Sequence, residues 1–480
     1  MVREADIRRW ALSALLLIVA SRVVVLLLTP NDLHGDEAQY AAWSRELAGG
    51  YFSKPPLVAW AIRASTEVFG TAEWAVRLWS PLAHGLAALA LWRAGARLFD
   101  EVTGAWAALA YLTLPGVVLS SAIASTDALV LLWTAVLLWA WTELREGGRS
   151  WRWTLVAGAA LGLGALSKYA AVFPLVGLAA VWVTDRPTRE ALPLPRVAVV
   201  AAVAGVMLLP NLLWNLRHDF ATARHTASNA NLNAELLNPL EGLEFFGSQF
   251  GVWGPVVFGL FLAAVVRGWR EPRTRALALV ALAPLLVILV QAFVSRANAN
   301  WAATALMPGT LLTVAVWHGW WRASAVGVNA LVALVMSVAL VSPGFADAVG
   351  LANSFKRVRA WPETVEALAA RAEDVGAQTV AVDNRITFYG LDHYGLGERV
   401  PVAMWQMEAV PHNHAELTRP LVEGAGEPML FVNYHTVHRA RVEADFAEVE
   451  VLEPLRVELG GGKVRELELL LVSGYRRAER

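Results

Sequence analysis

The sequence has no cysteine, and only 17% of its residues are charged, with a formal net charge of -1. The absence of cysteine excludes disulfides, thiolate metal sites and cysteine nucleophiles. The balanced charge argues against a nucleic-acid partner. The sequence also lacks a P-loop and a glycine-rich dinucleotide turn, so no pattern in it predicts a nucleotide site. The function therefore belongs to a class that does not depend on cysteine chemistry.

Apolar residues are abundant instead. They make up 56% of the 480 residues, and the mean hydropathy is +0.46. A soluble core needs far less apolar surface, so most of this surface must face lipid, and we predict an α-helical polytopic membrane protein. The first apolar run follows two arginines but has no cleavage site behind it, so we expect a retained helix. About eleven runs approach the roughly 20 residues that span a bilayer: 11–28, 76–98, 105–119, 128–141, 154–166, 170–183, 197–213, 243–266, 276–294, 302–317 and 323–341.

Arginine marks alternate loops of this predicted membrane domain. By the positive-inside rule, these loops should be cytoplasmic. The opposite loops hold most of the unusual polar residues, so we expect the chemistry on the external, periplasmic side of a cytoplasmic (inner) membrane. An odd number of spans places the chain after Val341 on that side too. The arginines are Arg3, Arg8, Arg9, Arg93, Arg97, Arg145, Arg149, Arg152, Arg186, Arg189, Arg196, Arg267, Arg270, Arg273, Arg275 and Arg322.

A second domain follows the last apolar run. Hydropathy falls after Val341, and Pro343 with Gly344 marks a boundary. The pattern beyond it predicts a helix at 362–374 and strands at 379–383, 429–434, around 449–459 and at 464–472. We therefore expect two domains. A membrane domain covers 1–341 with an external catalytic loop at 29–75, and a small soluble α/β domain covers 342–480.

The densest polar segment is the first external loop. It contains two adjacent carboxylates, Asp36 and Glu37, at the edge of a low-dielectric slab. Such a pair needs a cation, a metal or a shared proton, and one member is then suited to general-base catalysis. Asp36 followed by Gln39 also fits a helix N-cap pair, and this alternative stays open.

A cation in the same loop accompanies these carboxylates. Lys54 precedes two prolines, which restrict it to extended conformations and so direct its ammonium group. The alternative is that Lys54 only snorkels to lipid head groups. We predict an active site in this loop, with Tyr40 and Tyr51 in support.

Further candidates lie in the later external loops. Lys168 is either a snorkelling cation at a helix end or a phosphate ligand. Asp127 either caps the helix that it begins or supports catalysis. Arg217 and Arg224 offer paired donors to phosphate oxygens, and a solvated loop is the alternative. The remaining supporting candidates are Tyr169, His225, Asn300 and Trp301.

A metal site is only weakly indicated. His218, Asp219 and His225 carry metal-binding groups, but their spacing matches no specific ligand motif. The participation of a divalent cation therefore stays open.

Five motifs occur in a fixed order along the chain. They are DE at 36–37, GYFSKPPLVAW at 50–60, STDAL at 125–129, LSKYAAVFP at 166–174 and RANANW at 296–301. Their order and spacing resemble the GT-C membrane glycosyltransferases, and most of all the bacterial family 39-like transferases. The latter are relatives of the protein O-mannosyltransferases and of the lipid A aminoarabinose transferases. The resemblance covers roughly residues 11–341.

The resemblance implies an enzyme that takes a sugar from a polyprenyl-phosphate donor on the external face. It further implies that Asp36 is the base that activates the acceptor and that Glu37 and Lys54 shape the donor site. It leaves open whether the acceptor is a lipid, a glycan or a protein. Two other classes also stay open: a lipid or sugar transporter or flippase, although no paired inverted halves are visible, and a noncatalytic membrane scaffold.

Overall fold

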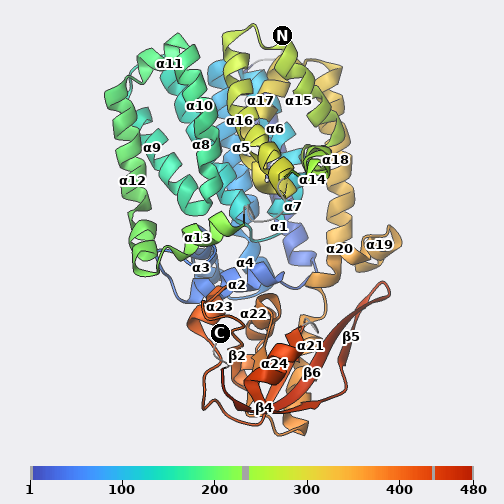
Figure 1. The fold of residues 1–480 in the computed structure, drawn as a ribbon. Helices are drawn as coiled ribbons and strands as arrows, with labels where there is room; N and C mark the ends of the chain where they lie inside the picture. The colour runs from blue at the N-terminus through green and yellow to red at the C-terminus, as the bar shows by residue number, and fades with distance from the viewer. Residues whose placement is uncertain (1–3, 230–236, 435–437, 478–480) are drawn as a thin grey trace. The chain divides into compact units, whose positions relative to one another are not determined.

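The computed structural model describes residues 4–229, 237–434 and 438–477. The chain forms two compact units, whose elements are labelled in Figure 1. The membrane unit contains Met1–Leu28 and Leu47–Ser337, and the α/β unit contains Thr29–Glu46 and Val338–Arg480. Each unit is therefore built from two separate stretches of chain.

The membrane unit is helical. Over the described ranges, six helices are long and apolar enough to cross a membrane, or up to eight if each of two bent pairs is one span. This confirms the predicted α-helical polytopic membrane fold, and every predicted apolar run falls on a helix or on a pair of helices. The main helices are α1 (Glu4–Leu28), α3 (Leu57–Phe69), α5 (Trp79–Leu98), α6 (Glu101–Thr113), α7 (Pro115–Ser121), α8 (Thr126–Gly147), α9 (Trp151–Ser167), α10 (Phe173–Thr184), α12 (Leu194–Arg217), α14 (Pro239–Trp253), α15 (Pro255–Arg267), α16 (Pro272–Val294), α17 (Leu306–Val316) and α18 (Trp320–Val341).

Two predicted spans are bent. The run 105–119 was expected to be one helix, but α6 and α7 meet at 65°, so that expectation is wrong. The run 243–266 was expected to be one helix, but α14 and α15 meet at 111°, so the expectation of a single straight helix is wrong. Gly254 forms the corner with a φ of 83°, and a Cβ there would lie 1.8 Å from the Asn329 side-chain oxygen. Only glycine tolerates both conditions, and hydropathy does not report them.

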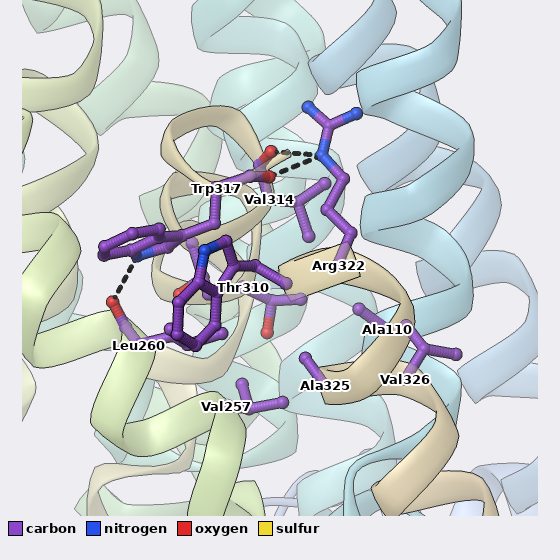
Figure 2. Close-up of a pocket in the computed structure, with 11 residues that line it drawn as sticks. Ala110, Val257, Leu260, Thr310, Val314, Trp317, Arg322, Ala325 and Val326 are labelled. Atoms are coloured by element: carbon purple, nitrogen blue, oxygen red, sulfur yellow. Dashed lines mark hydrogen bonds between the residues drawn. The ribbon is translucent and has the colours of Figure 1, made fainter. Parts of the chain in front are cut away.

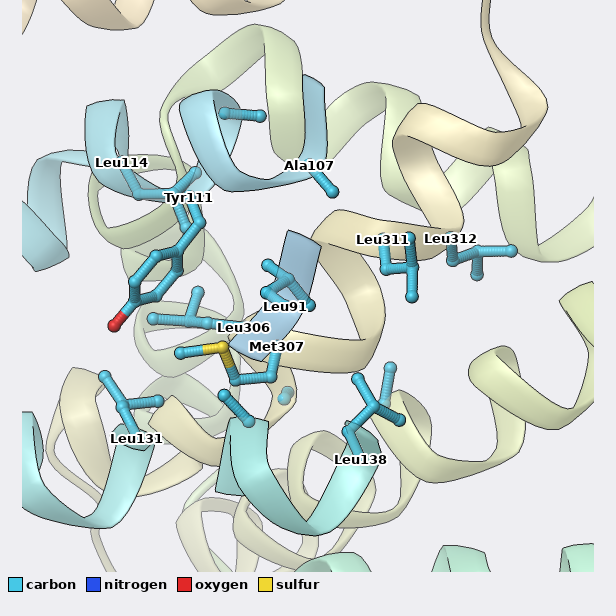
Figure 3. Packing of buried hydrophobic residues seen from close by; sticks show 14 of the residues in the cluster. Leu91, Ala107, Tyr111, Leu114, Leu131, Leu138, Leu306, Met307, Leu311 and Leu312 are labelled. Carbon is cyan, nitrogen blue, oxygen red and sulfur yellow. The ribbon is translucent and has the colours of Figure 1, made fainter. Parts of the chain in front are cut away.

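The centre of the membrane unit is packed with alanine and leucine. Figure 3 shows Leu91 from α5, Leu131 and Leu138 from α8, and Met307 and Leu311 from α17, all of them buried. The outer helices differ, because only 11% of the apolar window of α12 and 17% of that of α18 is buried. This uncovered apolar surface is what a lipid environment requires.

Several arginines of the loops predicted to be cytoplasmic gather at one end of the membrane unit. Ion pairs connect loops that the positive-inside rule assigned to one side, and α8 carries Arg145 near its last turn but Asp127 in its first. A helix of this length is roughly 33 Å long, so Asp127 lies at the opposite end from the arginines. The pairs are Arg8–Glu101 at 2.6 Å, Arg97–Glu143 at 3.1 Å, Arg145–Asp185 at 2.9 Å and Arg273–Glu146 at 2.8 Å.

The α/β unit contains a six-stranded sheet in its described residues. The strand order is β2-β1-β3-β6-β4, with β5 paired to β6. The first three strands are mutually parallel where they pair, and β6 is antiparallel to β3, β4 and β5. The strands are β1 (Thr379–Val382), β2 (Val402–Met404), β3 (Met429–Asn433), β4 (Phe446–Val451), β5 (Leu455–Gly460) and β6 (Lys463–Tyr475).

The sequence pattern anticipated much of this unit. The predicted helix 362–374 is α21 (Trp361–Asp374), and the strands predicted at 379–383, 429–434 and 464–472 are β1, β3 and β6. The strand predicted around 449–459 is wrong as a single element, because it is divided into β4 and β5. Pro454 lies between them and cannot donate a ladder hydrogen bond. The short strand β2 was not predicted.

The segment 29–46 belongs to the α/β unit rather than to the membrane unit. Its helix α2 (Gly35–Arg45) packs against α22 (Arg385–His393), so closely that a Cβ on Gly35 would lie 2.3 Å from Ile386 Cγ2. Just before α2, the Leu33 amide donates to the Tyr394 hydroxyl at 2.7 Å. The expected boundary kept the whole loop 29–75 with the membrane domain, whereas the structure divides this loop between Glu46 and Leu47.

Candidate functional site

The N-terminus of α2 assigns different roles to the two adjacent carboxylates. His34 is the N-cap, because its Nδ1 accepts a hydrogen bond from the Asp36 amide at 3.2 Å. Glu37 completes a capping box by accepting from the His34 amide at 2.9 Å, and it is only 2% exposed. The alternative that Asp36 and Gln39 form the cap is therefore wrong. Glu37 has a structural role in the helix terminus, which its prediction as a catalytic residue did not include.

Asp36 takes no part in the cap with its side chain and pairs with a residue of α22 instead. Its side chain is 42% exposed, and its Oδ1 accepts a hydrogen bond from Arg385 Nη1 at 2.7 Å. Burial alone lowers the pKa of the Arg385 guanidinium, but the charge and hydrogen bond of Asp36 outweigh burial and raise that pKa above its ordinary value. Asp36 is thus an accessible carboxylate held by a permanently charged partner, and it can take a proton from a hydroxyl group.

Arg385 was not identified from the sequence. It is the first residue of α22, directly after β1 and the cap residue Asn384. The end of a parallel strand followed by a helix N-terminus is a common place for functional residues, and this was the one available signal. Tyr40, predicted as a supporting residue, is buried, and its ring packs 5.2 Å from that of Trp43.

A second cluster of predicted residues lies in the membrane unit. Lys168, at the C-cap of α9, donates to Asp127 Oδ1 at 2.6 Å, and Asn300 donates to Asp127 Oδ2 at 2.6 Å. The lysine and aspartate side chains are only 17% and 12% exposed. Asp127 therefore orders a cation and an amide rather than serving as the N-cap of α8, which is Ser125.

This cluster borders a cavity of about 480 Å³ within the membrane unit. Polar groups at the cavity include Lys54 and Lys168 together with Tyr169 and Trp301. The rest of the lining is mostly apolar and comes in large part from α16, with Phe173 at the start of α10. Its further polar residues are Ser53, Thr226, Asn229 and Gln291. An elongated molecule with an anionic head and a hydrocarbon tail matches this combination.

The loop that carries Lys54 is fixed by backbone hydrogen bonds. The Tyr51 amide donates to the Lys54 carbonyl at 3.1 Å, and Thr222 donates to the Tyr51 carbonyl at 2.6 Å. Tyr51 itself is buried, and its hydroxyl accepts from the Ala48 amide at 3.2 Å. Tyr169 is held in turn by donating to Asn211 at 2.6 Å. Tyr51 and Tyr169 thus support the backbone around the cavity.

Other predicted residues are not brought to this cavity. Arg217, at the end of α12, and Arg224, in α13 (Ala221–Ser228), are exposed and do not line it. The His225 ring packs edge-on against Phe52 at 5.5 Å. No group of three or more His, Asp or Glu side chains in the described ranges is arranged to hold a metal ion.

A second, small pocket lies among α6, α15, α17 and α18 and is lined almost entirely by apolar residues. Figure 2 shows that Arg322 and Trp317 border it, and Arg322 Nε donates to the carbonyls of Val314 at 2.8 Å and Trp317 at 2.7 Å. The Trp317 indole donates to the Leu260 carbonyl at 2.9 Å. These hydrogen bonds give the polar groups of Arg322 and Trp317 a structural role, and the remaining lining is nearly all apolar.

Comparisons with known proteins agree on one class. A family model described as dolichyl-phosphate-mannose-protein mannosyltransferase matches residues 53–214. The chain is 38% identical over 374 residues to the lipid A galacturonosyltransferase RgtD of Rhizobium johnstonii, covering 76% of this chain and 78% of that protein. It is 29% identical over 271 residues to undecaprenyl phosphate-alpha-4-amino-4-deoxy-L-arabinose arabinosyl transferase 1 of Sodalis glossinidius, covering 50% of this chain and 46% of that protein.

A solved structure shares the fold. The crystal structure of ArnT from Cupriavidus metallidurans bound to undecaprenyl phosphate matches with a TM-score of 0.65 and 18% identity, covering 97% of this chain and 99% of that chain. At that identity the likeness concerns the fold alone.

Proposed function

Because the chain belongs to the family of membrane glycosyltransferases that contains the lipid A galacturonosyltransferase of Rhizobium johnstonii, we propose that it transfers a sugar from a polyprenyl-phosphate carrier to a lipid acceptor on the external face of the cytoplasmic membrane. The chain is a multi-pass membrane glycosyltransferase by this membership. The comparisons do not favour the transporter or scaffold alternatives.

The cavity bordered by Lys54, Lys168 and α16 carries the proposal. Lys54 and Lys168 border it, and the remainder of its wall is mostly apolar. A polyprenyl-phosphate sugar needs this pairing, because its phosphate requires cations while its isoprenoid chain requires an apolar surface. The Asp127–Lys168 ion pair, with Asn300 on the other carboxylate oxygen, keeps the ammonium in place before the donor arrives. The exposed Arg217 and Arg224 are weaker candidates for the same phosphate.

Asp36 is the proposed general base. The acceptor hydroxyl oxygen attacks the anomeric carbon of the donor sugar, and its proton passes to the Asp36 carboxylate. The bond between the anomeric carbon and the phosphate oxygen breaks, and the polyprenyl phosphate leaves with the electron pair of that bond. The two lysines stabilise the charge that develops on the leaving phosphate. A single displacement of this kind inverts the anomeric configuration.

A lipid-linked uronic acid is the donor that we infer. The name of the relative at 38% identity specifies galacturonic acid as the sugar and lipid A as the acceptor. The cavity is compatible with this choice, since two lysines border it and an anionic sugar adds a carboxylate to the phosphate.

A transfer assay tests the donor and the acceptor together. The full chain in phospholipid vesicles is given lipid A and undecaprenyl phosphate that carries either galacturonic acid or 4-amino-4-deoxy-L-arabinose. We expect the mass of lipid A to increase by one galacturonic acid residue with the first donor only. Transfer of the amino sugar instead would contradict the inferred donor, and transfer from neither donor would contradict the proposed function.

We also expect all of these residues to lie on the same side of the membrane. The arginine loops form one connected end of the membrane unit, and Asp127 lies at the other end of α8. The positive-inside rule then places Lys54, Asp127, Lys168 and the whole α/β unit on the periplasmic side. Alkaline phosphatase joined after Gly474 should be active, whereas the same enzyme joined after Gly148 should be inactive. The reverse pattern would rule out this topology.

A further inference from the structure

We propose that Arg385 is a positioning residue that holds the Asp36 carboxylate for proton abstraction, so that the α/β unit takes a direct part in sugar transfer. This inference rests on the proposed role of Asp36 as the base. It gives the C-terminal sequence, for which no motif predicted a role, a defined task.

The contacts of Arg385 define the position of the carboxylate. Its Nη1 donates to Asp36 Oδ1 at 2.7 Å and also to Gln39 Oε1 at 2.5 Å. Gln39 is one helical turn further along α2 and only 1% exposed, so its side chain is immobilised by packing. Arg385 therefore joins a carboxylate that is 42% exposed to an amide that is buried. In this way one rotamer of Asp36 is selected.

The backbone that carries Arg385 is itself rigid. Asn384 caps α22 by accepting hydrogen bonds from the amides of Ile386 at 2.9 Å and Thr387 at 3.2 Å. β1 ends two residues before Asn384, and its four residues are fully buried in the sheet. Ile386 then contacts α2 at Gly35, where no side chain larger than hydrogen fits. The sheet, the cap and the helix contact together fix the backbone position of Arg385.

A separate ion pair anchors the far end of α2. Arg45 donates to Asp392 Oδ2 at 2.5 Å, and Arg419 donates to Asp392 Oδ1 at 2.7 Å. Burial alone raises the pKa of Asp392, but the hydrogen bonds and charges of Arg419 and Arg45 outweigh it and hold this pKa below its ordinary value. Asp392 therefore anchors the same helix without touching Asp36. This makes it a matched control for Arg385.

Charged and titratable groups approach Asp36 from both α2 and α22. On α2, the His34 ring nitrogen lies 3.9 Å from Asp36 Oδ2, and Glu37 and Tyr40 are neighbours in sequence. On α22, Arg385 contacts the carboxylate, and burial raises the pKa of Tyr389 so that its hydroxyl stays neutral. Arg385 is thus a permanent cation in direct contact with Asp36. Removing it must raise the pKa of the base, because an adjacent cation favours the ionised carboxylate.

The test compares Arg385→Gln and Arg385→Lys with the wild-type chain over a range of pH. We expect Arg385→Gln to lower kcat by about ten- to a hundredfold, because the carboxylate is no longer held. We expect the acid limb of kcat/KM to move up by about one pH unit. Arg385→Lys keeps the positive charge but loses the planar guanidinium group. The acid limb of kcat/KM should therefore stay at its wild-type pH, while kcat should be higher than in Arg385→Gln but lower than in the wild-type chain.

Two control variants separate positioning from general loosening. Asp392→Asn should leave the acid limb where it is, even if α2 is less firmly anchored. Arg399→Gln breaks an exposed ion pair with Glu366 in the same unit and should change neither kcat nor the pH of the acid limb. An equal shift of the acid limb in Asp392→Asn would overturn the inference.

The Asp36→Asn variant distinguishes this inference from the proposed function. If Arg385 acts through Asp36, the double variant Asp36→Asn/Arg385→Gln should be no slower than Asp36→Asn alone. If Asp36→Asn is inactive but Arg385→Gln keeps the wild-type rate and pH profile, the inference is wrong and the proposed function stands. If Asp36→Asn transfers sugar normally, the role of Asp36 as the base and this inference are both wrong, whereas sugar transfer itself stands.

Discussion

Replacing Asp36 by asparagine should lower the rate of sugar transfer by about two to four orders of magnitude, because asparagine keeps the shape of the side chain but cannot take a proton. The protein should remain folded, since the N-cap of α2 is provided by His34 and Glu37 and not by Asp36. Donor binding should also persist, because Lys54 and Lys168 are unchanged. The measurement is the initial rate of transfer, with thermal unfolding and donor binding recorded on the same sample.

Glu37→Gln is the companion variant. The amide oxygen of glutamine can still accept from the His34 amide, so the capping box is retained and the rate should fall only slightly. Stability should change by a fraction of about 1 kcal/mol. A loss of rate in Glu37→Gln as large as that in Asp36→Asn would mean that the base has been assigned to the wrong carboxylate.

The second large effect is expected at the two lysines of the cavity. Lys54→Ala and Lys168→Ala each remove a charge-assisted contact to phosphate, which is worth about 1.5–3 kcal/mol, or roughly ten- to a hundredfold in donor affinity. The measurement is binding of undecaprenyl phosphate to the full chain in vesicles. Lys356→Ala, at an exposed lysine of the α/β unit, is the control and should bind the lipid normally.

Lys168→Ala is also expected to lower stability, and this effect has to be measured separately from donor affinity. It leaves the Asp127 carboxylate largely buried without its cation, so the variant can lose stability as well as affinity. The double variant Asp127→Asn/Lys168→Ala removes both charges and should recover stability but not donor affinity. Unchanged affinity in both lysine variants would show that these side chains only snorkel to head groups.

The features that were predictable from the sequence are those that depend on local pattern. Apolar runs identify the membrane helices, because the length and hydropathy that a segment needs to span a bilayer are properties of that segment alone. The close approach at the Gly254 corner is not part of such a pattern, since the side chain that leaves no room for a Cβ there is Asn329, 75 residues further along the chain. Hydropathy averages over such a contact and cannot detect it.

The candidate site was predictable residue by residue but not as an arrangement. Asp127 and Lys168 were each singled out, yet their ion pair joins residues 41 positions apart, and Asn300 reaches the same carboxylate across 173 positions. The cap of α2 was misassigned because histidine is not among the preferred cap residues, so the pattern of Asp36 and Gln39 took precedence. Arg385 lies 349 positions from Asp36, and no periodicity relates the two.

The division of the loop 29–75 has a consequence for biosynthesis. The segment 29–46 leaves the ribosome early, but its packing partner α22 is made almost 350 residues later. At the roughly 5–20 residues per second of translation, α2 waits about 20–70 seconds before Ile386 and Arg385 exist. During this interval the short helix has no surface to pack on, and isolated helices of this length are marginal in water. The proposed base is therefore assembled only after synthesis of the C-terminal sequence, so a chain that stops early carries Asp36 without the residues that would position it.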